Sequence, residues 1–292
     1  MQSAELLQLA IAGLKNGSIY ALLALGFTIV FAATNVINFA QGEFYMLGGM
    51  LAVFAFDALG LPLWVAVPLA VVAVTVVGLL FEVLAIRPRK DAEPMSLIII
   101  TVGGSLVLSS LARHLFGSDA LPLPEFTPGP SIPFLGAAIE RQTVWIWGLV
   151  LLAVTGLTFL YSRTRLGRAM RACMQNREAA RLMGIDTGRI VMISFALAAA
   201  LGALAGVAVT PLTSTRFDIG AGIAVKGFAA AILGGLGGPL AAVAGGLLLG
   251  LIEQAVIPFS SALKDVVALV VLLVVLFVRP QGLFGRSQRE KT

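Results

Sequence analysis

Long apolar runs are the feature that most limits how this chain can fold. A helix needs about 20 mostly apolar residues to cross the hydrocarbon core of a bilayer. Clear runs of roughly that length cover residues 62–86, 95–117, 142–161, 190–210 and 262–278. Three further regions, residues 6–31, 36–58 and 226–257, are apolar but interrupted by glycine and polar residues. We therefore predict an all-α polytopic membrane protein with about eight transmembrane helices, some of them broken.

The composition leaves no room for a soluble domain. Hydrophobic residues make up 59% of the 292 residues and charged residues only 12%, so residues 1–292 are expected to form a single transmembrane domain. No basic residue precedes Lys15, which argues against a cleaved secretory signal. A lone cysteine, Cys173, and a lone histidine, His114, exclude an intrachain disulfide and a histidine-based metal site, so no metal is expected.

The charges are segregated along the chain. Residues 163–189 hold seven arginines against two acids, and residues 279–292 hold four Lys or Arg against Glu290. The Pro-rich loop at residues 118–141 instead has three acids against Arg141. Positive loops stay in the cytoplasm, so residues 87–93, the loop at 163–189 and the C-terminal tail are expected inside. The pattern sets topology and does not indicate nucleic-acid binding.

The loop at residues 163–189 is more than a charged linker. Apolar residues recur in it at helical spacing, which predicts short amphipathic helices; they are Leu166, Ala169, Met170 and Cys173. A compact second helix should begin at the N-cap Asn176, carry Glu178 in its first turn and Arg181 late, and end before a left-handed Gly184. Two interpretations remain open. The loop either only fixes orientation, or it docks a cytoplasmic motor subunit.

A glycine-rich core should break the apolar block at residues 226–254. Three apolar blocks separate the inside loop at 163–189 from the inside tail, and an odd number of crossings would put that tail outside. One block must therefore cross twice or turn back. The expected break comprises Gly234, Gly235, Gly237, Gly238 and Pro239. Such a break has to be shielded by protein or face water.

A second interruption, at residues 35–52, carries four polar residues ahead of the pair Gly48 and Gly49. They are Asn35, Asn38, Gln41 and Glu43. Broken segments in both halves of a chain suggest an inverted repeat with a substrate route at its interface. Glu43 could pair with the ammonium group of an amino acid, and an exposed helix N-terminus after Gly42 with its carboxylate. The alternative is a purely structural, hydrogen-bonded helix break.

Pairs of glycines at four-residue spacing predict close helix packing. The pairs are Gly13 and Gly17, Gly202 and Gly206, and Gly246 and Gly250. We expect these contacts to lie within the chain rather than between subunits.

Several stretches carry a resemblance to a known family. Glu178-Ala179-Ala180, followed after three residues by Gly184, resembles the E-A-A-x-x-x-G signature of permease subunits in ATP-binding-cassette importers, although no Leu-Pro follows. The chain is similar to branched-chain amino acid permeases of this class in six stretches. They are GLKNGSIYALLALGFTIVF at 13–31, INFAQGE at 37–43, EVLAIRPRK at 82–90, RLGRAMRACMQNREAARLMGI at 165–185, GFAAAILGGLGGPLAAVAGGLLLGLIEQ at 227–254, and KDVVALVVLLVVLFVRPQGLFG at 264–285. In that family a His or similar residue usually stands at the position of Gln41.

The resemblance implies a multi-pass permease subunit in the bacterial inner membrane, with its C-terminus in the cytoplasm. Its implied partners are a second related permease, two cytoplasmic ATPase subunits and a periplasmic substrate-binding protein. The residues expected to couple to the ATPase are Asn176, Glu178, Ala179, Ala180, Arg181, Leu182 and Gly184. The chain has no G-x-x-x-x-G-K-[ST] motif, so we expect a non-enzymatic subunit without a cofactor, whose partners bind the ATP.

Only the resemblance favours branched-chain or other apolar amino acids as cargo. Relatives that import urea, short amides or aromatic compounds could have nearly the same sequence. A self-sufficient channel or secondary carrier is the main alternative from another class, with the broken helices forming its filter. The Arg-rich helical loop argues against it. An integral-membrane enzyme is disfavoured because no His/Asp/Glu or Ser/His cluster occurs at useful spacing.

Overall fold

The fold is a bundle of membrane-length helices. The computed structural model describes residues 3–89, 92–236, 238–260, 263–279 and 281–284. Six helices there are long and apolar enough to cross a membrane: α1 (Ser3–Thr34), α3 (Leu63–Phe81), α4 (Pro94–Phe116), α5 (Arg141–Arg163), α8 (Thr187–Thr213) and α10 (Pro239–Val256). Shorter helices are α2 (Gln41–Asp57), α9 (Ile219–Gly234) and α11 (Lys264–Val278). The predicted all-α polytopic fold is confirmed, and the described residues hold six membrane-length helices where about eight crossings were expected.

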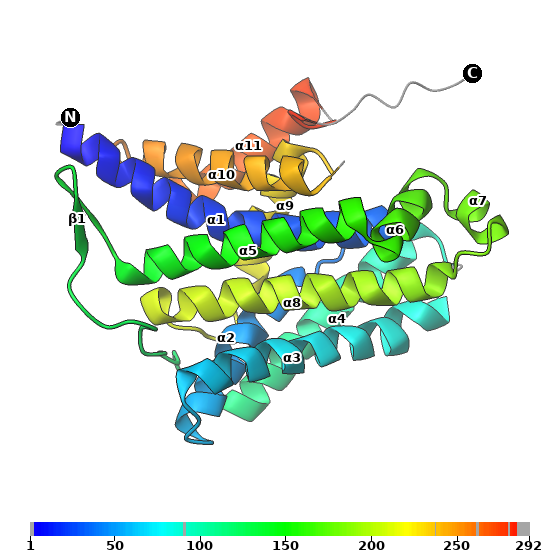
Figure 1. The fold of residues 1–292 in the computed structure, drawn as a ribbon, viewed down its shortest axis with the longest axis horizontal. Coiled ribbons are helices and arrows are strands. Elements are labelled where there is room, and N and C mark those ends of the chain that lie inside the picture. The colour runs from blue at the N-terminus through cyan, green and yellow to red at the C-terminus, as the bar shows by residue number, and fades with distance from the viewer. Residues whose placement is uncertain (1–2, 90–91, 237, 261–262, 280, 285–292) are drawn as a thin grey trace.

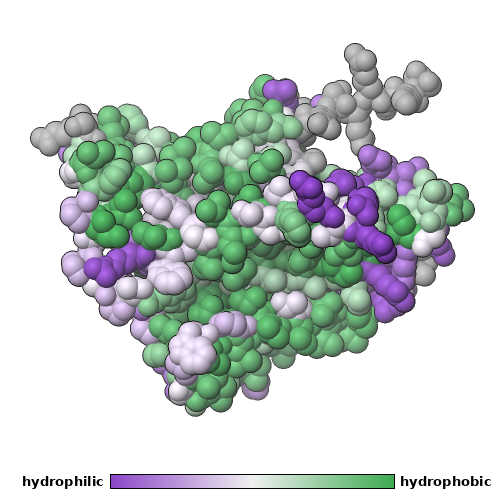
Figure 2. Space-filling view, viewed as in Figure 1, coloured by the Kyte–Doolittle hydropathy of each residue, from purple (hydrophilic) through white to green (hydrophobic). Residues whose placement is uncertain are grey.

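The long helices run roughly side by side, and their burial separates a centre from a perimeter (Figure 1). In the most apolar window of α1, 89% of residues are buried, against 17% in α4 and 22% in α5. Figure 2 shows the result as a hydrophobic band, with hydrophilic side chains gathered toward the two ends of the molecule. The apolar surfaces of α4 and α5 therefore lie on the perimeter of the bundle, while α1 forms its centre.

The two ends of the bundle differ in structure. At one end the strands β1 (Ile132–Phe134) and β2 (Ala137–Ile139) form an antiparallel hairpin beside the start of α1. Gln8 exchanges two hydrogen bonds with the backbone of Ala138, and Lys15 pairs with Glu140 at 2.8 Å. The other end, which we call the basic end, carries α6 (Arg165–Gln175) and α7 (Arg177–Leu182).

The glycine pairs pack helices within the chain, as expected. A Cβ atom on Gly17 would lie 2.8 Å from the Leu247 Cα, and one on Gly250 would lie 2.3 Å from the backbone nitrogen of Gly17. The backbones of α1 and α10 therefore touch. The region at residues 6–31, expected to be interrupted, is instead part of one continuous helix, because its small residues make room for α10 rather than breaking α1.

The expected break at residues 234–239 is confirmed. Helix α9 ends at Gly234, Gly235 adopts a left-handed φ of +90°, and α10 begins at Pro239. Gly237 lies outside the described residues. The C-terminal segment covers this turn: the N–H groups of Leu283 and Phe284 donate to the carbonyls of Leu233 and Gly234 at 2.9 and 3.2 Å. The chain thus supplies donors for carbonyls that the end of α9 leaves open.

A buried ion pair joins α9 to α10. The Lys226 ammonium donates to Oε1 of Glu253 at 2.7 Å, and the Tyr20 hydroxyl donates to Oε2 of the same carboxylate at 2.5 Å. The Glu253 side chain is only 1% exposed. Both carboxylate oxygens therefore have partners, which is what allows an acid to lie inside the bundle.

Candidate functional site

Helix α6 is amphipathic and packs its apolar face against the bundle. It starts at the N-cap Thr164, whose hydroxyl accepts the N–H of Gly167 at 3.0 Å. Met170 and Cys173 are buried beneath it, which confirms the predicted amphipathic helix. Burial raises the pKa of the Cys173 thiol, and the charge of Arg177 offsets only part of this rise. Cys173 is therefore a packing residue rather than a reactive thiolate.

Helix α7 is capped at both ends as the sequence predicted. The Asn176 side chain accepts the N–H of Ala179 at 2.9 Å, and Glu178 lies in the first turn. Gly184 has a φ of +83°. Its N–H donates to the Arg181 carbonyl, and the next N–H, that of Ile185, donates to the Ala180 carbonyl. This pair of bonds is a Schellman cap, which makes a very short helix a defined unit.

The tip of α7 presents apolar side chains away from the bundle. Leu182 is 89% exposed and Met183 is 83% exposed, whereas Ala180 is buried and holds the helix against the bundle. Exposed apolar side chains surrounded by arginines suit a protein partner, because aromatic residues, methionine and arginine are enriched in interfaces. Met183 was missed by sequence reasoning; its position directly after the last helical residue was the available signal.

The segment between α1 and α2 is a hydrogen-bonded break. Asn35 is exposed and has a left-handed φ of +55°. The fully buried Asn38 accepts the N–H of Ala40 with its side-chain oxygen at 3.1 Å, and the Thr101 hydroxyl accepts the N–H of Phe39 at 3.2 Å. Asn38 and Thr101 therefore each satisfy one backbone N–H that the missing helical turn leaves open.

Gln41 is enclosed by helices on two sides. Its side-chain amide donates to the Ala198 carbonyl of α8 at 2.9 Å, and the residue has no exposed surface. A Cβ atom on Gly26 of α1 would lie 2.1 Å from the Gln41 Nε2 atom, so a larger residue there would displace the Gln41 amide. The Gln41 Oε1 atom has no hydrogen-bond partner. These contacts give Gln41 a structural role in joining α1, α2 and α8.

Glu43 is the acid of this group, and it shares with Asn38 and Gln41 a buried polar atom that has no hydrogen-bond partner. Its Oε1 atom accepts the Ser105 hydroxyl at 2.9 Å, whereas its Oε2 atom is buried without a hydrogen-bond partner. A Cβ atom on Gly220 would lie 2.4 Å from that oxygen, so Oε2 is directed at the first turn of α9. A buried acid with an unused acceptor is the polar feature here that most favours a ligand with hydrogen-bond donors.

The helix N-terminus after Gly42 is not exposed as expected. Helix α2 begins two residues earlier, at Gln41, and both Gln41 and Gly42 are buried. The N–H of Gln41 donates to the Asn38 carbonyl, and that of Glu43 donates to the Ala40 carbonyl. These groups are used within the chain, because the turn before α2 folds back onto it. They are not available to a cargo carboxylate in this conformation.

The site residues thus fall into two separate groups. Asn38, Gln41 and Glu43 cluster where α2 meets α8 and α9, with Asn35 outside that cluster, and the residues of α7 lie at the basic end. The short helices α2 and α9 meet in close contact, since a Cβ atom on Gly42 would lie 2.0 Å from the Gly220 carbonyl oxygen. The start of α2 therefore lies beside the first turn of α9, whereas the break at residues 234–239 follows the other end of that helix. The inverted repeat stays a prediction.

Comparison with known proteins identifies the family. The family model described as "Branched-chain amino acid transport system / permease component" matches residues 9–276. The chain belongs to this permease family. The branched-chain amino acid permease protein BraD of Pseudomonas aeruginosa is 34% identical over 303 residues, covering 98% of this chain and 97% of that protein. LivH of Escherichia coli K12 is 35% identical over 300 residues, with the same coverage.

More distant relatives extend the comparison to other transport components. The ribose import permease RbsC of E. coli K12 is 28% identical and covers 91% of this chain. The solved structure of PsaBC from Streptococcus pneumoniae in complex with Fab aligns with a TM-score of 0.52 at 11% identity, over 96% of this chain and 94% of that one. That likeness concerns the fold alone. The chain is a multi-pass membrane protein of a permease family.

Proposed function

We propose that this chain is the permease subunit of an ATP-driven importer for branched-chain or other apolar amino acids in the bacterial inner membrane. The full-length match to permeases of branched-chain amino acid systems carries the proposal. Its partners would be a second related permease, two ATPase subunits and a periplasmic binding protein. The sequence has no phosphate-binding loop of its own, so the ATPase subunits would bind the ATP.

Uptake by the complete transporter tests this function. Cells expressing the whole transporter are expected to accumulate labelled leucine, isoleucine and valine, and not urea, short amides or aromatic compounds. A matched strain lacking only this permease supplies the background. Uptake of urea or amides in place of the amino acids would show that the chain serves a related importer with another cargo.

The basic end is proposed to face the cytoplasm. It carries the arginines of α6 and α7, and cationic loops are retained on that side. The start of α1 and the β-hairpin would then face the periplasm. A reporter enzyme that is active only outside the cytoplasm, fused after Gly285, is expected to stay silent. The same reporter inserted in the 118–141 loop should be active, and activity at Gly285 would overturn the topology.

Helix α7 is proposed to transmit ATPase motion to the bundle. Gly184→Val is expected to uncouple hydrolysis from import, because a left-handed backbone costs an L-residue about 1–2 kcal/mol and disfavours the Schellman cap. A Cβ atom at Gly184 meets no other atom within 4 Å, so the substitution strains the backbone without a clash. ATP hydrolysis and uptake by purified complexes would be measured together.

Gly184→Asn is the matched control, since asparagine tolerates the left-handed region. It should keep coupling close to that of the parent. Parent-like hydrolysis and uptake with Gly184→Val would show that the cap of α7 does not matter for coupling.

A further inference from the structure

A cavity of about 410 Å³ lies at the basic end, behind α7. Its walls come from the end of α1, the turns that follow α3, the start of α4, α7 and the start of α8. The volume falls within the roughly 300–1,000 Å³ typical of small-molecule sites. The cavity lies apart from the Glu43 cluster, because none of its lining residues belongs to α2 or α9.

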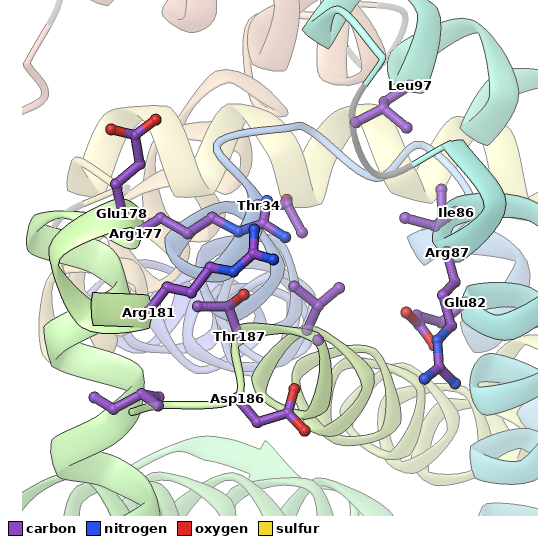
Figure 3. A pocket seen from close by; sticks show the side chains of 13 residues that line it. Thr34, Glu82, Ile86, Arg87, Leu97, Arg177, Glu178, Arg181, Asp186 and Thr187 are labelled. Carbon is purple, nitrogen blue, oxygen red and sulfur yellow. The ribbon is translucent and has the colours of Figure 1, made fainter. Parts of the chain in front are cut away.

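The two charged walls of this cavity have different chemistry. Figure 3 shows Arg177 and Arg181 reaching into it from α7, with Glu82 and Arg87 on the opposite wall, while Glu178 points away. Guanidinium groups bind carboxylates through paired hydrogen bonds. One side of the cavity therefore suits a carboxylate.

Glu82 supplies the complementary group. Glu82 is only 2% exposed, and its Oε2 atom has no hydrogen-bond partner. It begins a π-helix, Glu82–Ile86, and such helical irregularities often occur at functional sites. A buried, unpartnered carboxylate oxygen beside a cavity calls for a donor such as an ammonium group.

Part of the remaining lining is polar: it includes Thr34, Thr187 and Asp186, whose carboxylate pairs with Arg189 at 2.9 Å, and the rest is mainly apolar. The apolar part of the lining includes Ile86, Leu97 and Val191. We propose that this cavity binds a zwitterionic apolar amino acid, with its carboxylate on Arg177 and Arg181, its ammonium on Glu82, and its side chain on this apolar surface. This inference rests on the proposed function for its cargo. It adds a second binding site for that cargo, besides the Glu43 cluster, and this site contacts helix α7, which is proposed to couple to the ATPase.

Binding to the complete transporter tests the inference. The complex, with its ATPase subunits, is placed in nanodiscs without binding protein or nucleotide, and labelled leucine is the probe. Leucine should displace the label at least about tenfold better than 4-methylpentanoate, which lacks the ammonium group, or 3-methylbutylamine, which lacks the carboxylate. Glu82→Gln should weaken leucine about tenfold and leave 4-methylpentanoate unchanged, which removes the preference for the zwitterion.

The controls separate this site from others. Glu93→Gln removes an exposed acid at the start of α4, the end of that helix that lines the cavity. The transporter with this substitution should bind leucine like the parent. Binding that depends on Glu43 and not on Glu82 would place the amino acid in the central cluster and overturn the inference. Equal displacement by inorganic phosphate would show a plain anion site and also overturn it. An absence of Glu82-dependent binding in a preparation that imports leucine refutes this inference alone, whereas a failure to import leucine refutes the proposed function.

Discussion

Glu43→Gln is expected to lower amino acid uptake about tenfold or more while leaving the yield of assembled transporter close to that of the parent. Glutamine keeps the size of the side chain and an oxygen that can accept the Ser105 hydroxyl, now at 2.9 Å from Oε1. The substitution removes the charge and the open Oε2 acceptor, which we propose interacts with the ammonium group of the cargo when the route opens. Uptake, ATP hydrolysis and assembled yield would be measured on the same complexes.

Gln41→Ala is the informative comparison, because Gln41 has the contacts of a structural residue. The loss of its hydrogen bond to Ala198, and of the side chain that fills the space beside Gly26, should reduce assembly along with uptake. If Glu43→Gln instead abolishes assembly, both Gln41 and Glu43 have a structural role in the helix break. Normal uptake with both substitutions would remove the cluster from the transport route.

Lys226→Met is expected to destabilise the folded permease by about 3–5 kcal/mol, because it leaves a buried carboxylate without its cation. Methionine has nearly the same length, so the packing changes little. Glu253 would retain only the Tyr20 hydroxyl among the two donors described above. The effect is measured by thermal unfolding of the purified protein in detergent. The readout is the loss of the monodisperse peak in size-exclusion chromatography.

The double variant Lys226→Met, Glu253→Gln is the matched control. It removes both charges and should recover most of the lost stability, since a neutral amide can still accept the Tyr20 hydroxyl. Equal loss in the single and double variants would mean that Lys226 acts through packing and not through the ion pair.

Local features of the sequence were sufficient to predict α7 and the break between α9 and α10. The caps of α7 lie within nine residues, from Asn176 to Gly184, and each acts on backbone groups a few positions away. The break likewise follows from Gly235 and Pro239, whose backbone preferences hold in any surroundings. Predictions of this kind succeed because the deciding interactions are short in sequence.

The glycines of α1 show where the same reasoning fails. Gly13, Gly17 and Gly26 weaken a helix when considered alone, which is why an interrupted region was expected. In the bundle they face α10 and Gln41, and close packing outweighs their poor helix propensity. Propensity was overridden by contacts with residues far away in the chain.

The sequence by itself determined the membrane class, the apolar segments, the capped helix α7 and the family, because these depend on composition and on short patterns. Only the tertiary structure decided which polar residues have partners. Tyr20 and Glu253 are 233 positions apart, and Leu283 covers the carbonyl of Leu233 from the end of the chain. Glu43 and Glu82 both appear as acids near apolar segments, yet their surroundings come from different helices. Such pairings depend on how whole helices pack, and no local pattern encodes them.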